Sequence, residues 1–301
     1  MIKSQLTLKQ LEAFVSVVDT GSFRRAARVL NTTQPNVSNR ISTLEGLLDQ
    51  VLMHRDSGSI RLTEKGIELL AQARQILRAS ESFLETAARK DLIEDRLKLG
   101  VTELIACTWL HDFLRAFRAE YPSISVELQV DLSTEIERLL VAEELDLALH
   151  TGQSTPNIEA DLSLGGYHYQ WVVNQTIFKE LGTQPTLDLV FTYPILTHAR
   201  HTSAGHELHA FCRENSLPES QIIHSSSLNS CVPMAIDGMG IALLPNQLIR
   251  EQISRGELVP IDCGWTPSPL DFFARYDETK VSNYVANAAK LAKAIAESNR
   301  Q

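Results

Sequence analysis

Residues 31–48, with the sequence NTTQPNVSNRISTLEGLL, carry a helical pattern whose two faces differ in chemistry. Val37, Ile41, Leu44 and Leu48 are spaced so that they form one apolar stripe along an α-helix. The opposite face holds amides, hydroxyls and an arginine, whereas an ordinary solvent-facing helix is more often filled with Glu and Lys. The pattern predicts a helix that buries one side and keeps the other available for hydrogen bonding.

Two further helices are predicted before this one. Residues 7–20 have apolar positions at helical spacing, Gly21 interrupts the pattern, and residues 23–30 resume it. Ala26 and Ala27 are small, so another helix can cross the second of these closely. A short helix, a tight connection and a helix with a polar face are typical of a helix-turn-helix, whose second helix enters the DNA major groove.

The polar face of the third helix has the right chemistry for reading DNA. Gln and Asn side chains pair bidentately with adenine, Arg pairs with guanine, and Ser contacts base edges or phosphates. Pro35 in the first turn removes no helical hydrogen bond, because N–H groups there have no partner within the helix. The candidate DNA contacts in this region are Arg24, Thr33, Gln34, Pro35, Asn36, Ser38, Asn39 and Arg40.

A β-hairpin, or wing, is predicted after the third helix. Residues 51–67 alternate apolar and polar side chains around the turn sequence DSGS. Arg55 and Arg61 in this hairpin suit contacts with phosphates, which position a protein on DNA without reading its sequence. Plain solvated surface charge is the alternative interpretation of each arginine.

Residues 64–90 form a long helical pattern in which Leu70, Leu77 and Leu84 repeat every seven residues. Such a seam is usually buried against a partner helix, so we expect a homodimer. Its two helix-turn-helix units, the reading heads, would bind a two-fold symmetric DNA site. With only three repeats, a single helix lying on the rest of the chain is the alternative.

The distribution of charge separates the chain into two parts. The net charge of the 301 residues is −9, yet residues 1–90 hold 13 Lys and Arg against 9 Asp and Glu, while the remainder holds 15 against 28. A basic head on an acidic body fits a nucleic-acid-binding module attached to a sensory or catalytic domain. No apolar run approaches the length of a membrane span, no signal peptide is apparent, and the four cysteines are scattered, so we expect a cytoplasmic protein.

From residue 97 onward, predicted strands alternate with helices, a pattern that indicates a parallel α/β sheet. A second such unit begins near residue 169, and the chain returns to the first through LDFFARY at 270–276. Two lobes joined by crossing strands create a cleft, and ligands of open α/β sheets bind at the carboxyl ends of strands.

The first 90 residues resemble the N-terminal region of LysR-type transcriptional regulators. The resemblance rests on the run from Phe14 to Leu30 that contains GSF and the alanine pair, on TQPNVS at 33–38, and on RLTEKG at 61–66. In the body, LDLAL at 145–149 and DGMGIALLP at 237–245 are similar to the effector-binding domain of that family, itself like a periplasmic binding protein.

The resemblance implies a fold of class α plus α/β with three domains. These are a winged helix-turn-helix at 1–63, a linker and dimerisation helix at 64–90, and an effector-binding domain at 91–301. Lobe I would comprise about 91–166 and 268–301, and lobe II about 167–267. The implied partners are double-stranded promoter DNA, a small-molecule inducer and RNA polymerase, with homodimers or homotetramers, no membrane and no cofactor.

The resemblance also implies that a small inducer contacts positions at the strand ends of the body: Thr102, Glu103, Thr151, His198, Arg200, His201, Thr202, Ser203, Ser226 and Ser227. Thr202 or Ser203 can equally serve as helix N-caps. An acidic residue at position 103 is unexpected beside an anion site. It argues against a simple carboxylate inducer, or supplies a hydrogen-bond partner to a ligand amine or hydroxyl.

Several alternatives remain open for the body. His198, His201, His206 and His209 lie close together in the sequence, but no strong metal-ligand spacing accompanies them, so no metal site is predicted. Cysteine-based sensing has little support, because thiolate activation needs basic surroundings. No catalytic residues are predicted; an α/β enzyme or solute-binding protein with an accessory DNA-binding head is the competing class.

Overall fold

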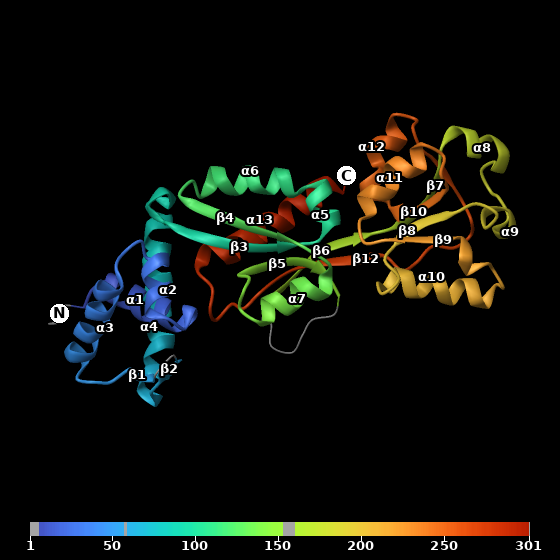
Figure 1. Ribbon diagram of the computed structural model, residues 1–301. Coiled ribbons are helices and arrows are strands. Elements are labelled where there is room, and N and C mark those ends of the chain that lie inside the picture. The colour runs from blue at the N-terminus through green and yellow to red at the C-terminus, as the bar shows by residue number, and fades with distance from the viewer. Residues whose placement is uncertain (1–5, 57–58, 153–159, 301) are drawn as a thin grey trace. The chain divides into compact units, whose positions relative to one another are not determined.

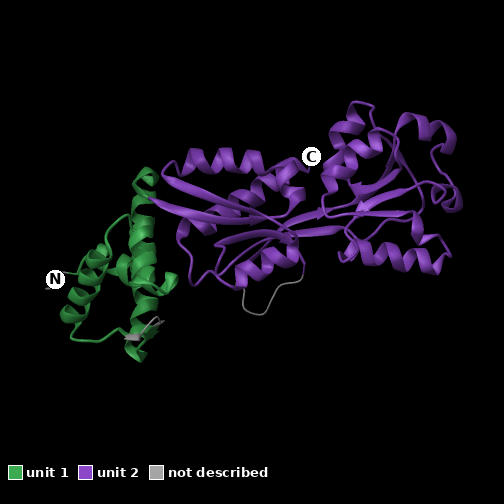
Figure 2. Cartoon of the chain, in the orientation of Figure 1, with its two compact units in different colours: residues 1–93 green, residues 94–301 purple. Residues whose placement is uncertain are grey.

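The computed structural model of the chain describes residues 6–56, 59–152 and 160–300. Within it the chain forms two compact units, residues 1–93 and 94–301, which Figure 2 colours separately. Each unit has its own hydrophobic core. Among the described residues, no helix combines the length and the apolar character that a bilayer crossing demands.

The first unit is a three-helix core followed by a hairpin and a long helix (Figure 1). Its elements are α1 (Leu8–Thr20), α2 (Phe23–Val29), α3 (Gln34–Leu48), β1 (Met53–Asp56), β2 (Ser59–Leu62), α4 (Glu64–Thr86) and the short helix η1 (Lys90–Leu92). The strands β1 and β2 pair antiparallel. The predicted winged helix-turn-helix and the long helix after it are therefore confirmed.

The helix ends in this unit follow from local sequence. Thr7 and Gln10 form a reciprocal capping box, and Gly21 ends α1 in the left-handed conformation, with φ of 62°. Thr63 caps α4 by accepting a hydrogen bond from the Gly66 N–H at 2.9 Å. These caps fix where each helix begins or ends.

The predicted heptad seam of α4 is partly covered by its own unit. Leu70 and Leu77 are half-buried and pack against the core of that unit, while Leu84 is half-buried outside it. The large apolar side chains that α4 does expose are Ile67, Ile76 and Phe83, at 61%, 42% and 74% exposure. A helix packed on its own domain and a short coiled coil share this periodicity, so the dimer through α4 stays a prediction.

The second unit contains two five-stranded sheets. The first has the order β4-β3-β5-β12-β6 and the second β11-β7-β10-β8-β9. The strands of the first are β3 (Asp95–Val101), β4 (Ile124–Val130), β5 (Leu147–Thr151), β6 (Ala160–Tyr167) and β12 (Leu270–Tyr276). Those of the second are β7 (Tyr169–Val173), β8 (Ile195–His198), β9 (Ile222–Ser225), β10 (Ile241–Pro245) and β11 (Val259–Ile261).

Both sheets are mixed rather than wholly parallel. Strands β3, β4 and β5 pair parallel, but β12 runs antiparallel to both β5 and β6. In the second sheet β7 is antiparallel to β10 and β11. The antiparallel members are the strands by which the chain passes between the lobes, since β6 leads directly to β7 and β11 leads to β12. These two passages give the predicted two-lobed α/β architecture.

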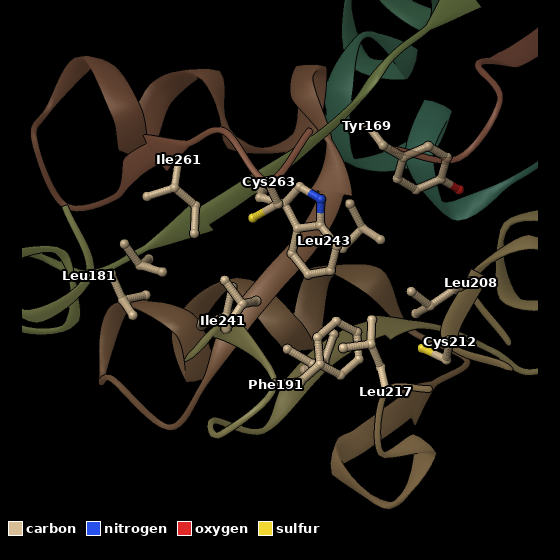
Figure 3. Packing of buried hydrophobic residues seen from close by; sticks show 14 of the residues in the cluster. Tyr169, Leu181, Phe191, Leu208, Cys212, Leu217, Ile241, Leu243, Ile261 and Cys263 are labelled. Carbon is tan, nitrogen blue, oxygen red and sulfur yellow. The ribbon is translucent and has the colours of Figure 1, made fainter. Parts of the chain in front are cut away.

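Helices flank the two sheets (Figure 1). They are α5 (Glu103–Thr108), α6 (Leu110–Glu120), α7 (Ser133–Val141), α8 (Gln175–Leu181), α9 (Leu187–Val190), α10 (Ser203–Glu214), η2 (Glu219–Gln221), α11 (Leu228–Ile236), α12 (Asn246–Ser254) and α13 (Asn283–Asn299). Figure 3 shows the core of the second sheet, where Phe191, Leu208 and Leu243 are buried. This apolar packing makes the second lobe a rigid support for its loops.

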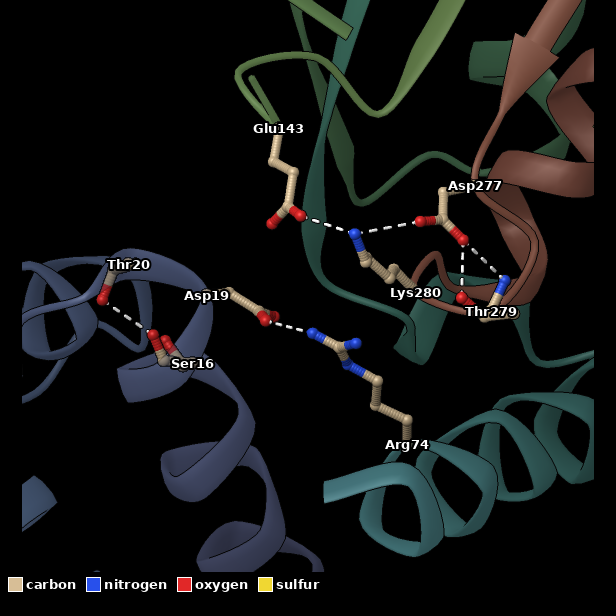
Figure 4. A network of polar contacts seen from close by, with 8 residues as sticks. All are labelled: Ser16, Asp19, Thr20, Arg74, Glu143, Asp277, Thr279 and Lys280. Atoms are coloured by element: carbon tan, nitrogen blue, oxygen red, sulfur yellow. Dashed lines mark hydrogen bonds and ion pairs between the residues drawn. The ribbon is translucent and has the colours of Figure 1, made fainter. Parts of the chain in front are cut away.

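Exposed ion pairs fasten segments within each unit (Figure 4). In the first unit, Arg74 of α4 pairs with Asp19 of α1. In the second, the ammonium of Lys280 lies 2.5 Å from a Glu143 carboxylate oxygen and 3.0 Å from one of Asp277, which ties the loop before α13 to the turn after α7. Because the Lys280 pairs are solvated, each contributes at most about 1 kcal/mol to stability.

Candidate DNA-reading surface and effector cleft

The helix α3 has the two-faced character that its sequence predicts. Val37, Ile41 and Leu44 are buried in the core of the first unit, at 0%, 0% and 1% exposure. Leu48, expected to continue the stripe, is 37% exposed because it is the last helical residue before Asp49, whose left-handed backbone ends the helix. Three residues of the stripe are enough to seat α3 against α1 and α2.

The residues predicted to read DNA lie on the other side of α3. Thr33, Gln34, Pro35, Asn36 and Asn39 are exposed, while Ser38 and Arg40 are half-buried. The Asn36 amide donates a hydrogen bond to the Thr32 hydroxyl at 3.2 Å, which orients this side chain along the helix start. Thr33 has the extended backbone of an N-cap, but its side chain makes no capping hydrogen bond. Polar groups at the N-terminal end of α3 therefore face outward.

Arginines occur on both sides of this surface. Arg24 is exposed on α2, and Arg61 is exposed on β2. Arg55 belongs to β1, but its side chain lies outside the part of the chain that the structure describes. Arg25 and Arg28 on α2 are exposed as well and were not among the predicted contacts. The sequence FRRAARV already signalled them, because the alanine pair fixes which face of α2 is buried.

In the second unit, two predicted effector residues begin the helix after β3. Thr102 is the N-cap of α5, with 8% of its surface exposed, and its hydroxyl oxygen is buried without a hydrogen-bond partner. Glu103 is the first residue of α5 and is half-buried. A buried hydroxyl without a partner is unusual in a folded protein and marks a position that a ligand or water can satisfy.

The Glu103 carboxylate connects the two lobes. Its two oxygens each accept a hydrogen bond of 2.6 Å, one from the Ser227 hydroxyl and one from the Leu228 backbone N–H. Ser227 is the N-cap of α11, which follows the second sheet's strand β9, whereas Glu103 follows β3 of the first sheet. The structure thus brings together three of the predicted effector residues, Thr102, Glu103 and Ser227, from positions more than a hundred residues apart in sequence.

Other predicted effector residues take partners within their own lobe. The Thr151 hydroxyl shares a hydrogen bond of 2.8 Å with the Ser133 hydroxyl in the first lobe. Thr202 caps α10 by accepting a hydrogen bond from the Gly205 N–H at 3.2 Å, which agrees with the alternative interpretation of this residue. His201, Ser203 and Ser226 are exposed.

His198 and Arg200 belong to a polar cluster at the end of β8. The His224 ring donates its Nδ1 hydrogen to the His198 carbonyl at 2.8 Å, and Arg200 donates from Nε to His209 Nε2 at 3.1 Å. His209 is buried and its Nδ1 lies 2.6 Å from a Glu219 oxygen. Burial lowers the pKa of the His198 side chain to about 4. This cluster joins β8, β9 and α10 through His209, His224 and the His198 carbonyl, whereas His201 and His206 are exposed.

The cysteines and histidines do not form the sites that the alternatives require. Burial raises the pKa of Cys212 to about 11 and that of Cys263 to about 12, the opposite of what a reactive thiolate needs. Burial also raises the pKa of the Cys231 and Cys107 thiols. Across residues 6–56, 59–152 and 160–300, no group of three or more His, Cys, Asp or Glu side chains is arranged to hold a metal ion.

Comparison with known proteins places both units in one family. Residues 8–67 match the model of the bacterial regulatory helix-turn-helix proteins of the lysR family, and residues 90–294 match that of the LysR substrate binding domain. The chain is 22% identical over 285 residues to the HTH-type transcriptional regulator CzcR of Bacillus thuringiensis subsp. konkukian, covering 95% of each. It is 28% identical over 240 residues to YofA of Bacillus velezensis, covering 80% of this chain and 81% of YofA.

Solved structures of full-length regulators share the fold. A full-length OxyR variant from Pseudomonas aeruginosa has a TM-score of 0.58 at 17% identity, covering 97% of this chain and 95% of that one. LysG from Corynebacterium glutamicum, solved with bound effector Arg, has a TM-score of 0.58 at 18% identity and covers 97% and 99%. With both family models matched, the second over most of the chain, this protein belongs to the LysR family of transcriptional regulators.

Proposed function

We propose that the chain is a ligand-responsive transcription factor that reads promoter DNA with α3 and holds a small-molecule inducer between its two lobes. The observation that carries the proposal is the outward polar face of α3 on a helix whose other face is fully buried. A helix so fixed presents the same side chains to every DNA site, which sequence reading requires.

The polar residues at the start of α3 and the arginines near it divide into two roles. Gln34, Asn36 and Asn39 have amides that pair with base edges, and Gln and Asn favour adenine. Thr33, Ser38 and Arg40 suit either bases or phosphates. Arg24, Arg55 and Arg61 contact phosphates on either side and set the register of the protein on the duplex.

Dimerisation supplies the second reading head. The exposed apolar side chains of α4 are Ile67, Ile76 and Phe83, and a partner copy of α4 would bury them. A homodimer, or a homotetramer formed through the effector-binding domains, places reading heads on both halves of a symmetric site. RNA polymerase is the further partner of such an assembly, and the protein acts in the cytoplasm as a regulator rather than an enzyme.

In this proposal the effector binds between the lobes, near the point where Glu103 of one lobe contacts α11 of the other. A ligand that binds one relative orientation of the lobes more tightly than another shifts the population toward it, and that shift changes the spacing of the reading heads. Relatives support both halves of the proposal. CbnR, a similar full-length structure with a TM-score of 0.51, is solved in complex with its target DNA, and LysG carries bound Arg.

The proposal predicts that substitutions on α3 and on β2 have different effects on DNA binding. Gln34→Ala should weaken binding to the specific site by about 1–3 kcal/mol and leave binding to scrambled DNA nearly unchanged. Arg61→Ala should weaken binding to both DNAs and reduce the dependence of affinity on salt. The specific site is first selected from a random duplex library with the wild-type protein, and affinities are then measured by fluorescence anisotropy.

Thermal unfolding of Gln34→Ala serves as the control, because this exposed side chain should contribute little to stability. Equal losses on the selected and scrambled duplexes would contradict base reading by Gln34. The inducer is sought separately by screening metabolites for those that raise the unfolding midpoint of the full-length protein.

A further inference from the structure

The N-terminal end of α11 carries an anion that belongs to the chain itself. Backbone N–H groups in the first turn of a helix have no partners within the helix, so they attract negatively charged groups. In this protein the Leu228 N–H and the Ser227 hydroxyl both donate to the Glu103 carboxylate, at 2.6 Å each. The place where a ligand carboxylate or phosphate would bind is therefore filled.

The lengths of these two hydrogen bonds indicate that the Glu103 carboxylate is held firmly at the start of α11. The Ser227 distance is typical of a hydroxyl that donates to a carboxylate, and the Leu228 distance is short for an N–H donor; hydrogen bonds to ionised acceptors are about twice as strong as neutral ones. Among the described residues, no Lys or Arg side chain forms an ion pair with Glu103, so donors of α11 and Ser227 alone hold its charge. An anionic ligand would have to displace this carboxylate and approach its negative charge.

Glu103 and Thr102 have hydrogen-bond acceptor positions that no group in the described part of the protein uses, and these suit a different kind of ligand. A carboxylate offers about four acceptor positions, of which Ser227 and Leu228 use two. The preceding residue in the chain, Thr102, has a buried hydroxyl without a hydrogen-bond partner, which can accept as well. A protonated primary amine carries three N–H donors and one positive charge, so it matches both features.

We propose that Glu103 determines the charge class of the effector: its carboxylate excludes anionic groups from the N-terminus of α11 and selects a ligand that carries a protonated amine. The inference rests on the proposed ligand-responsive function and specifies its chemistry. Glu103 also sits close enough to influence neighbouring thiols, since its negative charge contributes to the raised pKa of Cys107 and of Cys231.

The first test asks whether the anion position is filled in the wild type. We compare the full-length wild type with Glu103→Ala and with the control Glu257→Ala, which alters an exposed glutamate after α12. Each protein is unfolded thermally while sodium acetate replaces sodium chloride at constant ionic strength. Acetate should raise the unfolding midpoint of Glu103→Ala only, and it should bind this variant at least about tenfold more tightly than the wild type. Equal acetate responses of wild type and Glu103→Ala would overturn the proposal.

The second test asks whether the charge of Glu103 selects a cation. Glu103→Gln is the matched variant, because its amide can accept from the Leu228 N–H and donate to the Ser227 oxygen without carrying a charge. Methylammonium chloride, in place of sodium chloride, should raise the unfolding midpoint of the wild type and not that of Glu103→Gln. A contact that merely fastens the lobes together predicts the same response in both proteins, and that result would refute cation selection.

These tests are independent of DNA binding, which is measured on the same wild-type sample with the selected duplex. Loss of the proposed regulatory function would appear as absent sequence-specific DNA binding, whatever acetate and methylammonium do. Failure of the Glu103 inference would appear in the midpoints alone. The two failures are therefore distinguishable.

Discussion

Replacing Asp161 by asparagine should lower the free energy of unfolding by about 1–3 kcal/mol, because it removes a charged hydrogen-bond partner from a fully buried positive charge. The charge is that of Arg275, whose side chain is 0% exposed. The two residues face each other across the β6–β12 ladder, and Arg275 Nε donates to an Asp161 oxygen at 3.2 Å. Arg275 also donates to the Gly152 carbonyl at 2.6 Å, a contact that the substitution leaves in place.

A double variant separates the buried charge from other effects. Asp161→Asn combined with Arg275→Met removes both charges, so it should be more stable than Asp161→Asn alone when denaturant unfolding is compared. As a control, Glu127→Gln breaks the exposed pair with Arg96, 3.0 Å apart in the same sheet, and should cost less than about 1 kcal/mol. A double variant no more stable than the single one would show that loss of the ion pair between Asp161 and Arg275 is not the cause.

The same network provides a spectroscopic check. Burial, followed by the nearby charge of Arg275, lowers the pKa of His150 to about 4. Arg275→Met removes that positive charge, so the pKa of His150 should rise toward its ordinary value. The His150 ring signals in an NMR titration report this change directly.

Gly66→Ala should also destabilise the protein strongly, because it disrupts packing within the first unit. A Cβ atom at Gly66 would lie 2.0 Å from the Leu52 carbonyl oxygen, an overlap that backbone atoms must move to relieve. The same glycine donates the N–H that Thr63 accepts at the start of α4, so any shift weakens this cap as well. Overpacking of this kind costs about 1–3 kcal/mol or more, which chemical denaturation can measure.

Gly46→Ala is the matched control within the same unit. Gly46 lies within α3 and is exposed, and a methyl group added there would meet no atom within 4 Å. Alanine loses less conformational freedom than glycine on forming a helix, so this change should stabilise the protein by about 0.5–1 kcal/mol. Opposite signs for the two substitutions are expected, and equal destabilisation would mean that the close approach at Leu52 is not decisive.

The sequence was most informative where the structure is local. The stripe of Val37, Ile41 and Leu44 and the cap at Gly21 depend on residues a few positions apart, and the structure confirms them. The spacing of Leu70 and Leu77 identified a buried face of α4, but helical periodicity does not say which surface covers such a face. The core of the first unit covers part of it.

Contacts between segments that are distant in the chain could not be predicted from the sequence. The antiparallel strand β6 was missed, since its polar residues and two consecutive glycines obscure any alternation. Arg275 looks like a solvated arginine in LDFFARY, yet the fold buries it completely. Glu103 was noticed as an anomaly, but its partners on α11 lie more than a hundred residues away, so only the structure identifies them.

Site-specific photo-cross-linking tests most directly whether the exposed face of α3 touches nucleobases. A photo-reactive phenylalanine derivative is introduced at Asn39 of α3 or at Thr86, an exposed residue of the last turn of α4. Both proteins are first shown to retain binding to the selected duplex. We predict cross-links to specific bases of that duplex from position 39 and none from position 86. Retained binding with no base cross-link from position 39 would contradict the account.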